Sequence, residues 1–430
     1  MQKLELDLAG PDPRRGLSSM ASGLIGSEIL KISSEIRASV LAGKKITNFT
    51  VGDFSSKEFP IPDRLRAGIL AALAAGETNY PPSDGVLRLR EAVREFWQKR
   101  LDLEVPLQSV VIAGGSRPII YAAYRALVDP GDVVLYSVPS WNNNHYCHLV
   151  GARGVTVETG PEHGFLPTAA SLLPHLREAR LVALCTPLNP AGTVLAVDEV
   201  RRISEAIVAE NRRREGVGEK PLYLLYDQVY WMLTFGSARH ETPVHLVPEM
   251  SRYTVFVDGI SKAFAATGVR VGWGVGPRAV IAAMRDLLGH VGAWAPRAEQ
   301  VATAELLRDT RATDEFLATH KAGLQARLDA LHAGFTRMTE AGLPVRDIAP
   351  QGAIYLSVQF NLVGKRGLSS NDDVRKYLLE EAGFAVVPFQ AFGLGGENGW
   401  FRLSVGAVSV RDIEQALPRV EAALRKAVGG

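Results

Sequence analysis

The sequence predicts an α/β fold with a mainly parallel sheet, together with a smaller region of mixed helix and strand. Short β-rich runs alternate with amphipathic helical stretches through the middle of the 430-residue chain, and this alternation is typical of βαβ units. The run at 110–113 leads through Gly114, Gly115 and Ser116 into a helical stretch, as expected of a strand followed by a crossover helix. The C-terminal third differs, because one long helical stretch there precedes several strands and two further helices.

Each expected element follows from its local pattern, in chain order. An amphipathic helix is expected at 27–41, and the segment 46–62 is expected to be irregular because it contains Gly52 and two prolines. Apolar β-rich runs predict strands at 110–113, 132–136, 155–158, 181–185, 222–226 and 254–257, with helices at 118–127 and 197–214 between them. From about 295 the pattern predicts a long helical stretch to 342, strands at 353–359, 384–387 and 400–405, and helices at 371–381 and 410–426.

Chain length and the change of pattern together predict two domains. Residues 62–310 form the expected large domain, which holds the mainly parallel sheet. Residues 1–61 and 311–430 form the expected small domain, in which the N-terminal segment joins the C-terminal α+β part. No internal repeat or low-complexity linker interrupts the sequence.

The composition is that of an ordinary globular protein. Apolar residues make up 47% and charged residues 22% of the chain, and 48 basic against 46 acidic side chains leave a net charge of +2. This near balance argues against disorder and against an extended surface for nucleic acid. The basic run Arg212, Arg213 and Arg214, flanked by Glu210 and Glu215, is interpreted as the solvated face of a helix end.

Three features predict a cytoplasmic protein. The chain has only two cysteines, Cys147 and Cys185, and so few in a chain of this length indicate a reducing compartment without a disulfide framework. No window approaches the ~18 uninterrupted apolar residues of a membrane span. Residues 1–15 carry three acidic residues and two prolines, so no targeting segment is expected there.

A lysine stands just after the last apolar β-rich run, in the segment 258–273, which reads DGISKAFAATGVRVGW. This segment resembles the S-K-x-F-x-x-T-G-x-R-x-G signature of the class I and II aminotransferases, pyridoxal-phosphate enzymes of fold type I, and the chain looks similar to aspartate aminotransferases. The resemblance implies a mainly parallel, seven-stranded sheet flanked by helices, with a smaller α+β domain. It implies that Lys262 forms a Schiff base with the cofactor aldehyde, and that Ser261 and Arg270 bind the cofactor, Arg270 through its phosphate.

A carboxylate ends another apolar run, at Asp227 in the segment 222–230, which reads LYLLYDQVY. Burying a carboxylate at the end of a strand is costly unless it is paired. The resemblance implies that Asp227 pairs with the pyridine nitrogen of the cofactor, and that Tyr230 donates to its phenolic oxygen. A helix cap and a core aromatic would explain the two residues alone, but the position of Asp227, 35 residues before Lys262, favours the functional interpretation.

Two turns that leave apolar runs complete the expected cofactor site. The turn NPAG at 189–192 resembles the family turn in which an asparagine contacts the phenolic oxygen and lies near the substrate, so Asn189 is assigned to both. Gly115 and Ser116 precede a helix, where free N–H groups bind phosphate, and they are assigned to the cofactor phosphate.

Four further residues are assigned through the resemblance. Trp141 matches an aromatic ring stacked on the pyridine, and Arg402, inside an apolar run, matches the arginine that binds the substrate α-carboxylate bidentately. Gly52, in the early glycine turn, is assigned to substrate binding. Tyr80 matches a tyrosine that reaches the phosphate of the neighbouring subunit, which implies a homodimer.

The sequence departs from the family pattern at two positions. Gly259 replaces a serine that binds phosphate in some members, and Phe389 stands near the substrate side where many members have Pro-Gly. A second cation for a dicarboxylate substrate has Arg117 as its candidate. Phe54 and Phe59, together with Phe389, instead suggest an apolar pocket for an aromatic or aliphatic side chain.

The resemblance therefore implies an aminotransferase of class EC 2.6.1 in amino-acid metabolism, which transfers an amino group between an L-amino acid and a 2-oxo acid, with 2-oxoglutarate as the expected acceptor. No metal is expected. Two alternatives stay open: a C–S lyase, β-lyase or other amino-acid lyase with the same cofactor, and a ligand-sensing regulator that reuses the fold with an added DNA-binding domain. A nicotinamide dehydrogenase is disfavoured because the G-x-G-x-x-G fingerprint is absent.

Overall fold

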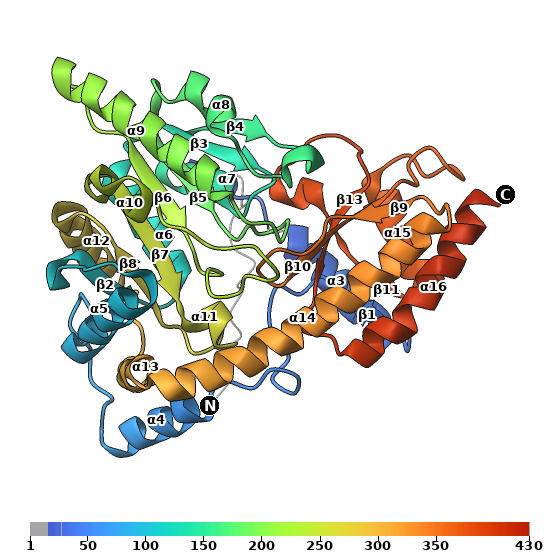
Figure 1. Ribbon diagram of the computed structural model, residues 1–430, viewed down its shortest axis with the longest axis horizontal. Helices are drawn as coiled ribbons and strands as arrows, with labels where there is room; N and C mark the ends of the chain where they lie inside the picture. Colours follow the sequence, from blue (N-terminus) through green and yellow to red (C-terminus); the bar gives the residue numbers. More distant parts are fainter. Residues whose placement is uncertain (1–15, 27, 430) are drawn as a thin grey trace, which may run out of the picture.

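A seven-stranded sheet lies at the centre of the larger part of the molecule (Figure 1). The computed structural model describes residues 16–26 and 28–429, so the prediction for residues 1–15 lies outside the described residues. The strands follow the order β2 (Val110–Ala113), β8 (Gly272–Val275), β7 (Thr254–Gly259), β6 (Tyr223–Asp227), β5 (Ala179–Cys185), β3 (Val133–Val138) and β4 (Arg153–Glu158). Only β8 runs antiparallel to its neighbours in this sheet, so the predicted mainly parallel sheet is confirmed.

Helices cover both faces of this sheet, because side chains of its strands alternate between two hydrophobic clusters. Leu225 packs in one cluster, and its neighbours Leu224 and Tyr226 pack in the other. The first face carries α6 (Ser116–Leu127), α7 (Asn143–Val150) and α12 (Arg278–Val291). The second carries α5 (Leu87–Leu101), α9 (Val197–Val217) and α13 (Arg297–Arg308), and α4 (Asp63–Ala74) packs on α13. Shorter helices are α8 (Ala169–Leu172), α10 (Pro243–Leu246) and α11 (Ile260–Ala263).

A four-stranded antiparallel sheet forms the core of the smaller part. Its order is β12 (Val387–Pro388), β13 (Trp400–Ser404), β10 (Tyr355–Phe360) and β9 (Val345–Asp347). The helices of this part are α14 (Thr310–Glu340), α15 (Asn371–Ala382) and α16 (Val410–Val428). Figure 1 shows α14 running from beside α13 to this small sheet, so one helix connects the two parts.

Part of the N-terminal segment lies among the C-terminal elements (Figure 1), whereas the carbonyl oxygen of Met20 lies 2.7 Å from Nε2 of His148 in α7. It contains α2 (Ser19–Ser22), α3 (Glu28–Leu41) and β1 (Thr47–Asn48). Strand β1 pairs in parallel with β11 (Phe384–Ala385), which ties the early chain to the region near the small sheet. The domain boundaries at 61/62 and 310/311 stay a prediction.

Two differences from the expected elements have a clear local cause. The helical stretch after 295 consists of α13 and α14, because Asp309 separates them and its side chain accepts a hydrogen bond from the Ala312 N–H (3.0 Å) as a cap. Strand β8 was not expected, since its glycines do not look like a strand. A Cβ on Gly272 would lie 2.6 Å from the carbonyl carbon of Gly115, so glycine is required where β8 passes the start of α6.

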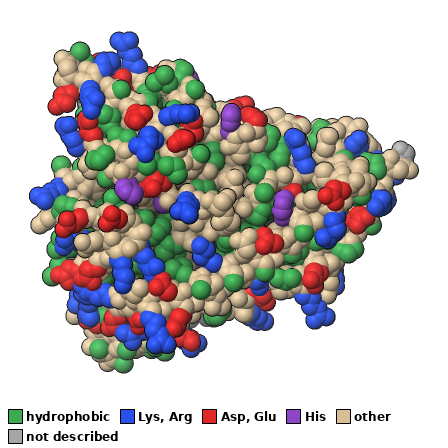
Figure 2. Space-filling model, in the orientation of Figure 1, with side chains coloured by type: hydrophobic (Ala, Val, Ile, Leu, Met, Phe, Trp, Pro, Cys, Tyr) green, Lys and Arg blue, Asp and Glu red, His purple; other side chains and the backbone are tan. Residues whose placement is uncertain are grey.

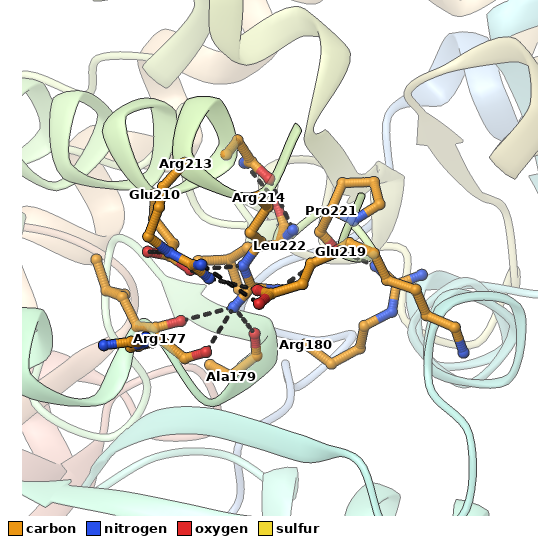
Figure 3. Close-up of polar contacts among 12 residues, drawn as sticks. Arg177, Ala179, Arg180, Glu210, Arg213, Arg214, Glu219, Pro221 and Leu222 are labelled. Carbon is orange, nitrogen blue, oxygen red and sulfur yellow. Dashed lines mark hydrogen bonds and ion pairs between the residues drawn. The ribbon is translucent and has the colours of Figure 1, made fainter. Parts of the chain in front are cut away.

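The basic run at the end of α9 is also different from its prediction. Arg212 is exposed, as expected, but Arg214 is only 5% exposed, so the interpretation of the whole run as a solvated face is wrong. Figure 3 shows the Arg214 guanidinium enclosed by acceptors. It donates to Oε1 of Glu210 (2.7 Å) and to the carbonyl oxygens of Leu176 (2.8 Å) and Ala179 (2.7 Å). Arg214 therefore anchors the end of α9 to the start of β5.

The visible surface carries acidic and basic side chains interspersed with one another (Figure 2), in agreement with the near-zero net charge. Within residues 16–26 and 28–429, no helix combines the length and the apolar character needed to cross a membrane.

Candidate active site

A cavity of about 490 Å³ lies where the carboxyl ends of the central strands meet the small sheet. Ligand sites of open α/β sheets lie at this edge, because the loops that follow neighbouring strands converge there. Ten of the predicted site residues line it: Gly52, Ser116, Trp141, Asn189, Asp227, Tyr230, Ser261, Lys262, Arg270 and Arg402. The structure thus brings together residues that are up to 350 positions apart in the chain.

Lys262 enters the cavity from α11, the single turn that follows β7. Its Nζ donates to the carbonyl oxygen of Gly52 (2.7 Å). Burial lowers the pKa of Lys262 to about 8, against an opposing effect of Asp53, because removing the ammonium from water disfavours its charged form. A substantial fraction of the amine is therefore neutral near physiological pH, as a nucleophile or proton acceptor requires.

Asp227 is the last residue of β6 and faces the cavity. Its Oδ1 accepts from the Val229 N–H (3.2 Å), and the structure gives it no ion pair with a described residue. Burial raises the pKa of this carboxyl to about 6, opposed by the Val229 N–H and the charge of Lys262. An unpaired carboxylate in this position is suited to a cationic or protonated nitrogen of a ligand.

The start of α6 forms a cradle for an anion. Gly115 caps this 12-residue helix with φ of 98°, and a Cβ there would lie 2.1 Å from Nη2 of Arg270. Arg270 donates to the carbonyl oxygens of Gly114 (2.9 Å) and Thr267 (2.6 Å) and pairs with no carboxylate among the described residues. Free N–H groups at the helix start, the hydroxyls of Ser116 and Ser261 and the Arg270 guanidinium together fit a phosphate group.

Arg402 lies on β13 and is 1% exposed. Its Nη1 donates to Oδ1 of Asn189 (3.2 Å) and its Nη2 to the carbonyl oxygen of Thr50 (2.7 Å), whereas its Nε has no partner. Its guanidinium carbon lies 4.7 Å from the ring centre of Tyr355 and 4.8 Å from that of Phe392. Because no described carboxylate pairs with this buried cation, it is suited to an anionic ligand in the cavity.

Trp141 and Arg117 lie together at the cavity wall. The Arg117 guanidinium carbon is 5.2 Å from the ring centre of Trp141, and both residues line the cavity. Arg117 is exposed, and its guanidinium has no ion pair with a described residue. Arg117 is therefore a further cation available to a ligand, besides Arg270 and Arg402.

Several predicted residues lie elsewhere. Tyr80 is 83% exposed, packs edge-on against Trp294 with ring centres 5.2 Å apart, and does not line the cavity. Gly115 does not line the cavity either, and its backbone packs against the Arg270 guanidinium. The predicted apolar pocket is wrong for Phe59 and Phe389, because both are buried in aromatic clusters of the core and neither lines the cavity.

Three polar residues near the site were not predicted. Asp53 lines the cavity and accepts from the Thr267 hydroxyl (2.5 Å), and Tyr355 lines it with its hydroxyl 2.7 Å from that of Tyr230. Asp258 is fully buried just before the lysine turn and accepts from Nε1 of Trp231 (2.9 Å), and burial raises its pKa to about 7. Asp258 follows an apolar run, as Asp227 does, and this pattern in the sequence could have identified it. No such pattern marks Tyr355, because strand pairing brings it to the site.

No three His, Cys, Asp or Glu side chains of the described ranges 16–26 and 28–429 are grouped in a way that would hold a metal ion.

Comparisons with known proteins agree over nearly the whole chain. The family model described as "Aminotransferase class I and II" matches residues 44–420. The chain is 30% identical over 423 residues to an aspartate aminotransferase of Rhizobium meliloti (strain 1021), covering 96% of this chain and 97% of that protein. It is 29% identical to a probable aspartate/prephenate aminotransferase of Thermus aquaticus, covering 96% and 100%.

Solved structures give the same result. The aspartate aminotransferase from Thermus thermophilus with maleate has a TM-score of 0.85 at 27% identity, covering 95% of this chain and 100% of that chain. The crystal structure of the enzyme from Rhizobium meliloti has a TM-score of 0.86 at 29% identity, covering 96% and 99%.

Proposed function

The chain belongs to the class I and II aminotransferases and is a pyridoxal-phosphate-dependent aminotransferase (EC 2.6.1). We propose that the cavity is its active site and that Lys262 binds the cofactor there as a Schiff base. One observation carries this assignment. The half-buried Lys262 amine, the unpaired Asp227 carboxylate and the unpaired Arg402 guanidinium converge on one cavity at the carboxyl edge of the sheet.

The residues of the cavity fit the parts of this cofactor. The start of α6, with Ser116 and Arg270, would hold its phosphate, and Asp227 would hold its ring nitrogen. Asn189 and Tyr230 would hold the phenolic oxygen, and Trp141 would lie against the ring. When bound, pyridoxal phosphate supplies an electron sink for the charge that develops at the substrate α-carbon.

Two residues of the chain then act on the substrate. Arg402 would bind the α-carboxylate with its free N–H groups, which fixes the orientation of the amino acid. Lys262, whose pKa is about 8, can accept a proton at Nζ and release it again near neutral pH. The loop that contains Gly52 contacts both residues, because the carbonyl oxygen of Gly52 accepts from Lys262 and that of Thr50 accepts from Arg402. When substrate replaces these contacts, the loop would lose both hydrogen bonds and would be free to move.

The proposed substrates are dicarboxylic amino acids, with 2-oxoglutarate as acceptor. The relatives named above are aspartate or aspartate/prephenate aminotransferases. Arg117, a further unpaired cation of the cavity, would bind the distal carboxylate. A lyase with the same cofactor is not favoured by these relatives, and release of pyruvate and ammonia without an oxo-acid acceptor would reveal one.

We further propose a cytoplasmic homodimer in which Tyr80 reaches the neighbouring active site. The exposure of Tyr80 and of Leu70, Leu73 and Leu87 supports this surface as the contact.

The test is the visible absorption of the purified holoenzyme. The wild type should absorb at visible wavelengths and lose this band on addition of aspartate, and a panel of amino donors with 2-oxoglutarate should favour aspartate and glutamate. Lys262→Ala should lose the band and the turnover. Lys220→Ala, a surface lysine paired with Asp129, is the control and should keep both. Retention of both by Lys262→Ala would refute the assignment.

A further inference from the structure

Tyr355 joins two ends of the active site. It begins β10, is 1% exposed and lines the cavity. Its hydroxyl oxygen is 2.7 Å from that of Tyr230, and its ring centre is 4.7 Å from the guanidinium carbon of Arg402. One side chain therefore contacts the residue assigned to the cofactor oxygen and the residue assigned to the substrate carboxylate.

The hydroxyl contact links the Tyr230 proton to the Tyr355 proton, since either oxygen can be the donor. A phenol has a single proton, and within residues 16–26 and 28–429 the only hydrogen-bond partner of the Tyr355 hydroxyl is Tyr230. If Tyr230 donates into the cavity, the Tyr355 hydroxyl must donate to the Tyr230 oxygen. A hydroxyl that accepts one hydrogen bond becomes a stronger donor in the next, because linked hydrogen bonds polarise one another.

The ring contact determines the plane of the Arg402 guanidinium. Tyr355 and Phe392, which lies in the short 3-10 helix η5 (Phe389–Phe392), both lie within 4.8 Å of the guanidinium carbon. Aromatic rings at this distance attract a buried cation. The side-chain oxygen of Asn189 and the backbone oxygen of Thr50 accept from the two terminal nitrogens. Rings and acceptors together fix the direction in which the remaining N–H groups face.

We propose that Tyr355 is a positioning residue with two separable effects: its hydroxyl directs the Tyr230 proton toward the cofactor oxygen, and its ring holds Arg402 in the plane that receives a carboxylate. This inference rests on the proposed function, since it takes the roles of Tyr230 and Arg402 from it. In this role Tyr355 acts through its two neighbours.

The hydroxyl effect is tested with Tyr355→Phe, which keeps the ring. The readout is the pH midpoint of the visible band of the substrate-free holoenzyme. Without the Tyr355 hydroxyl, Tyr230 should donate more weakly to the anionic phenolic oxygen, so this midpoint should rise, by at most about 0.5 to 1 unit. The Kd for maleate, used as a dicarboxylate probe, should change less than about twofold because the ring is retained.

The ring effect is tested with Tyr355→Leu and with Phe392→Leu, which removes the other ring. Both should raise the Kd for maleate, by about fivefold to thirtyfold for one buried cation–ring contact. Phe392→Leu should leave the pH midpoint unchanged, whereas Tyr355→Leu should raise it as Tyr355→Phe does. Melting temperatures of all variants identify those that fold.

Tyr230→Phe separates failure of this inference from failure of the proposed function. If Tyr230→Phe raises the midpoint and Tyr355→Phe does not, the hydroxyl effect is refuted and the role of Tyr230 stands. If neither variant moves the midpoint, both the hydroxyl effect of Tyr355 and the role assigned to Tyr230 are refuted. Wild-type affinity of Tyr355→Leu for maleate would refute the ring effect.

Discussion

Two buried arginines of this protein have opposite surroundings. Arg214 is 5% exposed and Arg402 is 1% exposed. Arg214 pairs with Glu210 and donates to carbonyl oxygens at the start of β5, so its charge and its donors are matched (Figure 3). Arg402 has two neutral acceptors, a free Nε, two aromatic rings and an adjoining cavity, and no carboxylate among the described residues.

The difference shows that burial of a charge does not by itself indicate function. A matched buried charge holds the chain together, and breaking the match is costly. An unmatched one at a cavity keeps its binding capacity for a ligand. This comparison predicts that the two arginines affect different properties of the protein when they are replaced.

The largest expected effect is that of Arg402→Gln. Loss of a charge-assisted, desolvated contact with the substrate carboxylate should lower kcat/KM for aspartate by about a hundredfold to a thousandfold or more. The melting temperature should not fall, because the substitution removes an unpaired buried cation. Arg402→Lys keeps the positive charge but loses the two parallel N–H donors of the guanidinium, so its kcat/KM should lie between those of the wild type and Arg402→Gln. A kcat/KM for Arg402→Gln equal to that of the wild type would break the comparison.

Arg214→Met should instead destabilise the fold. It leaves several buried carbonyl oxygens without their donor and leaves Glu210 with Arg213 alone, so the free energy of unfolding measured with urea should fall by about 3 kcal/mol. The kcat/KM of the folded enzyme should be unchanged. Arg212→Met, two residues away on the exposed side of the same run, is the matched control and should alter stability little. Equal stability of the two variants would contradict the role given to Arg214.

A third cation, Lys262, extends the comparison through its pH dependence. Burial disfavours the ammonium form, so in the apoenzyme an amine-reactive reagent should label Lys262 half-maximally near pH 8 instead of near the ordinary value of 10.5. Labelling rises with pH because only the neutral amine reacts. Asp53→Asn should lower the midpoint further, since Asp53 favours the charged form. The same peptide in the unfolded protein is the control, and an equal midpoint in both would show that the site does not perturb Lys262.

The smallest effect is expected at Arg117, which is unpaired but exposed. Arg117→Gln should lower kcat/KM for aspartate about tenfold relative to a monocarboxylic donor such as leucine, because solvent weakens its contact with the distal carboxylate. Arg125→Gln, on an exposed part of the same helix, should leave this ratio unchanged. An unchanged ratio in Arg117→Gln would remove Arg117 from substrate selection.

The sequence predicted those parts of the fold and of the candidate site that depend on local pattern. The strands before Asp227 and before Lys262 are continuous apolar runs, and such runs mark both a buried parallel strand and the residue at its end. Strand β8 could not be predicted from the sequence pattern, because its close packing against α6 requires glycines, which do not look like a strand. A pattern read along the chain does not contain that contact.

The residues that were missed or misread depend on long-range pairing. Tyr355 comes next to Arg402 only because β10 pairs with β13. Asp53 reaches Thr267 because the early chain returns to the lysine loop. Arg214 looked like part of a solvated run, and only the packing of α9 on the start of β5 supplies its acceptors. Such contacts follow from the assembled fold and leave no periodic signal.

The attachment point of the cofactor tests the active-site assignment most directly. The holoenzyme would be reduced with borohydride, which fixes the cofactor on the amine that holds it, and then digested and mapped by mass spectrometry. The mass of the reduced cofactor should be found on the peptide that contains Lys262. Its attachment to any other lysine, with the Lys262 peptide unmodified, would contradict the assignment.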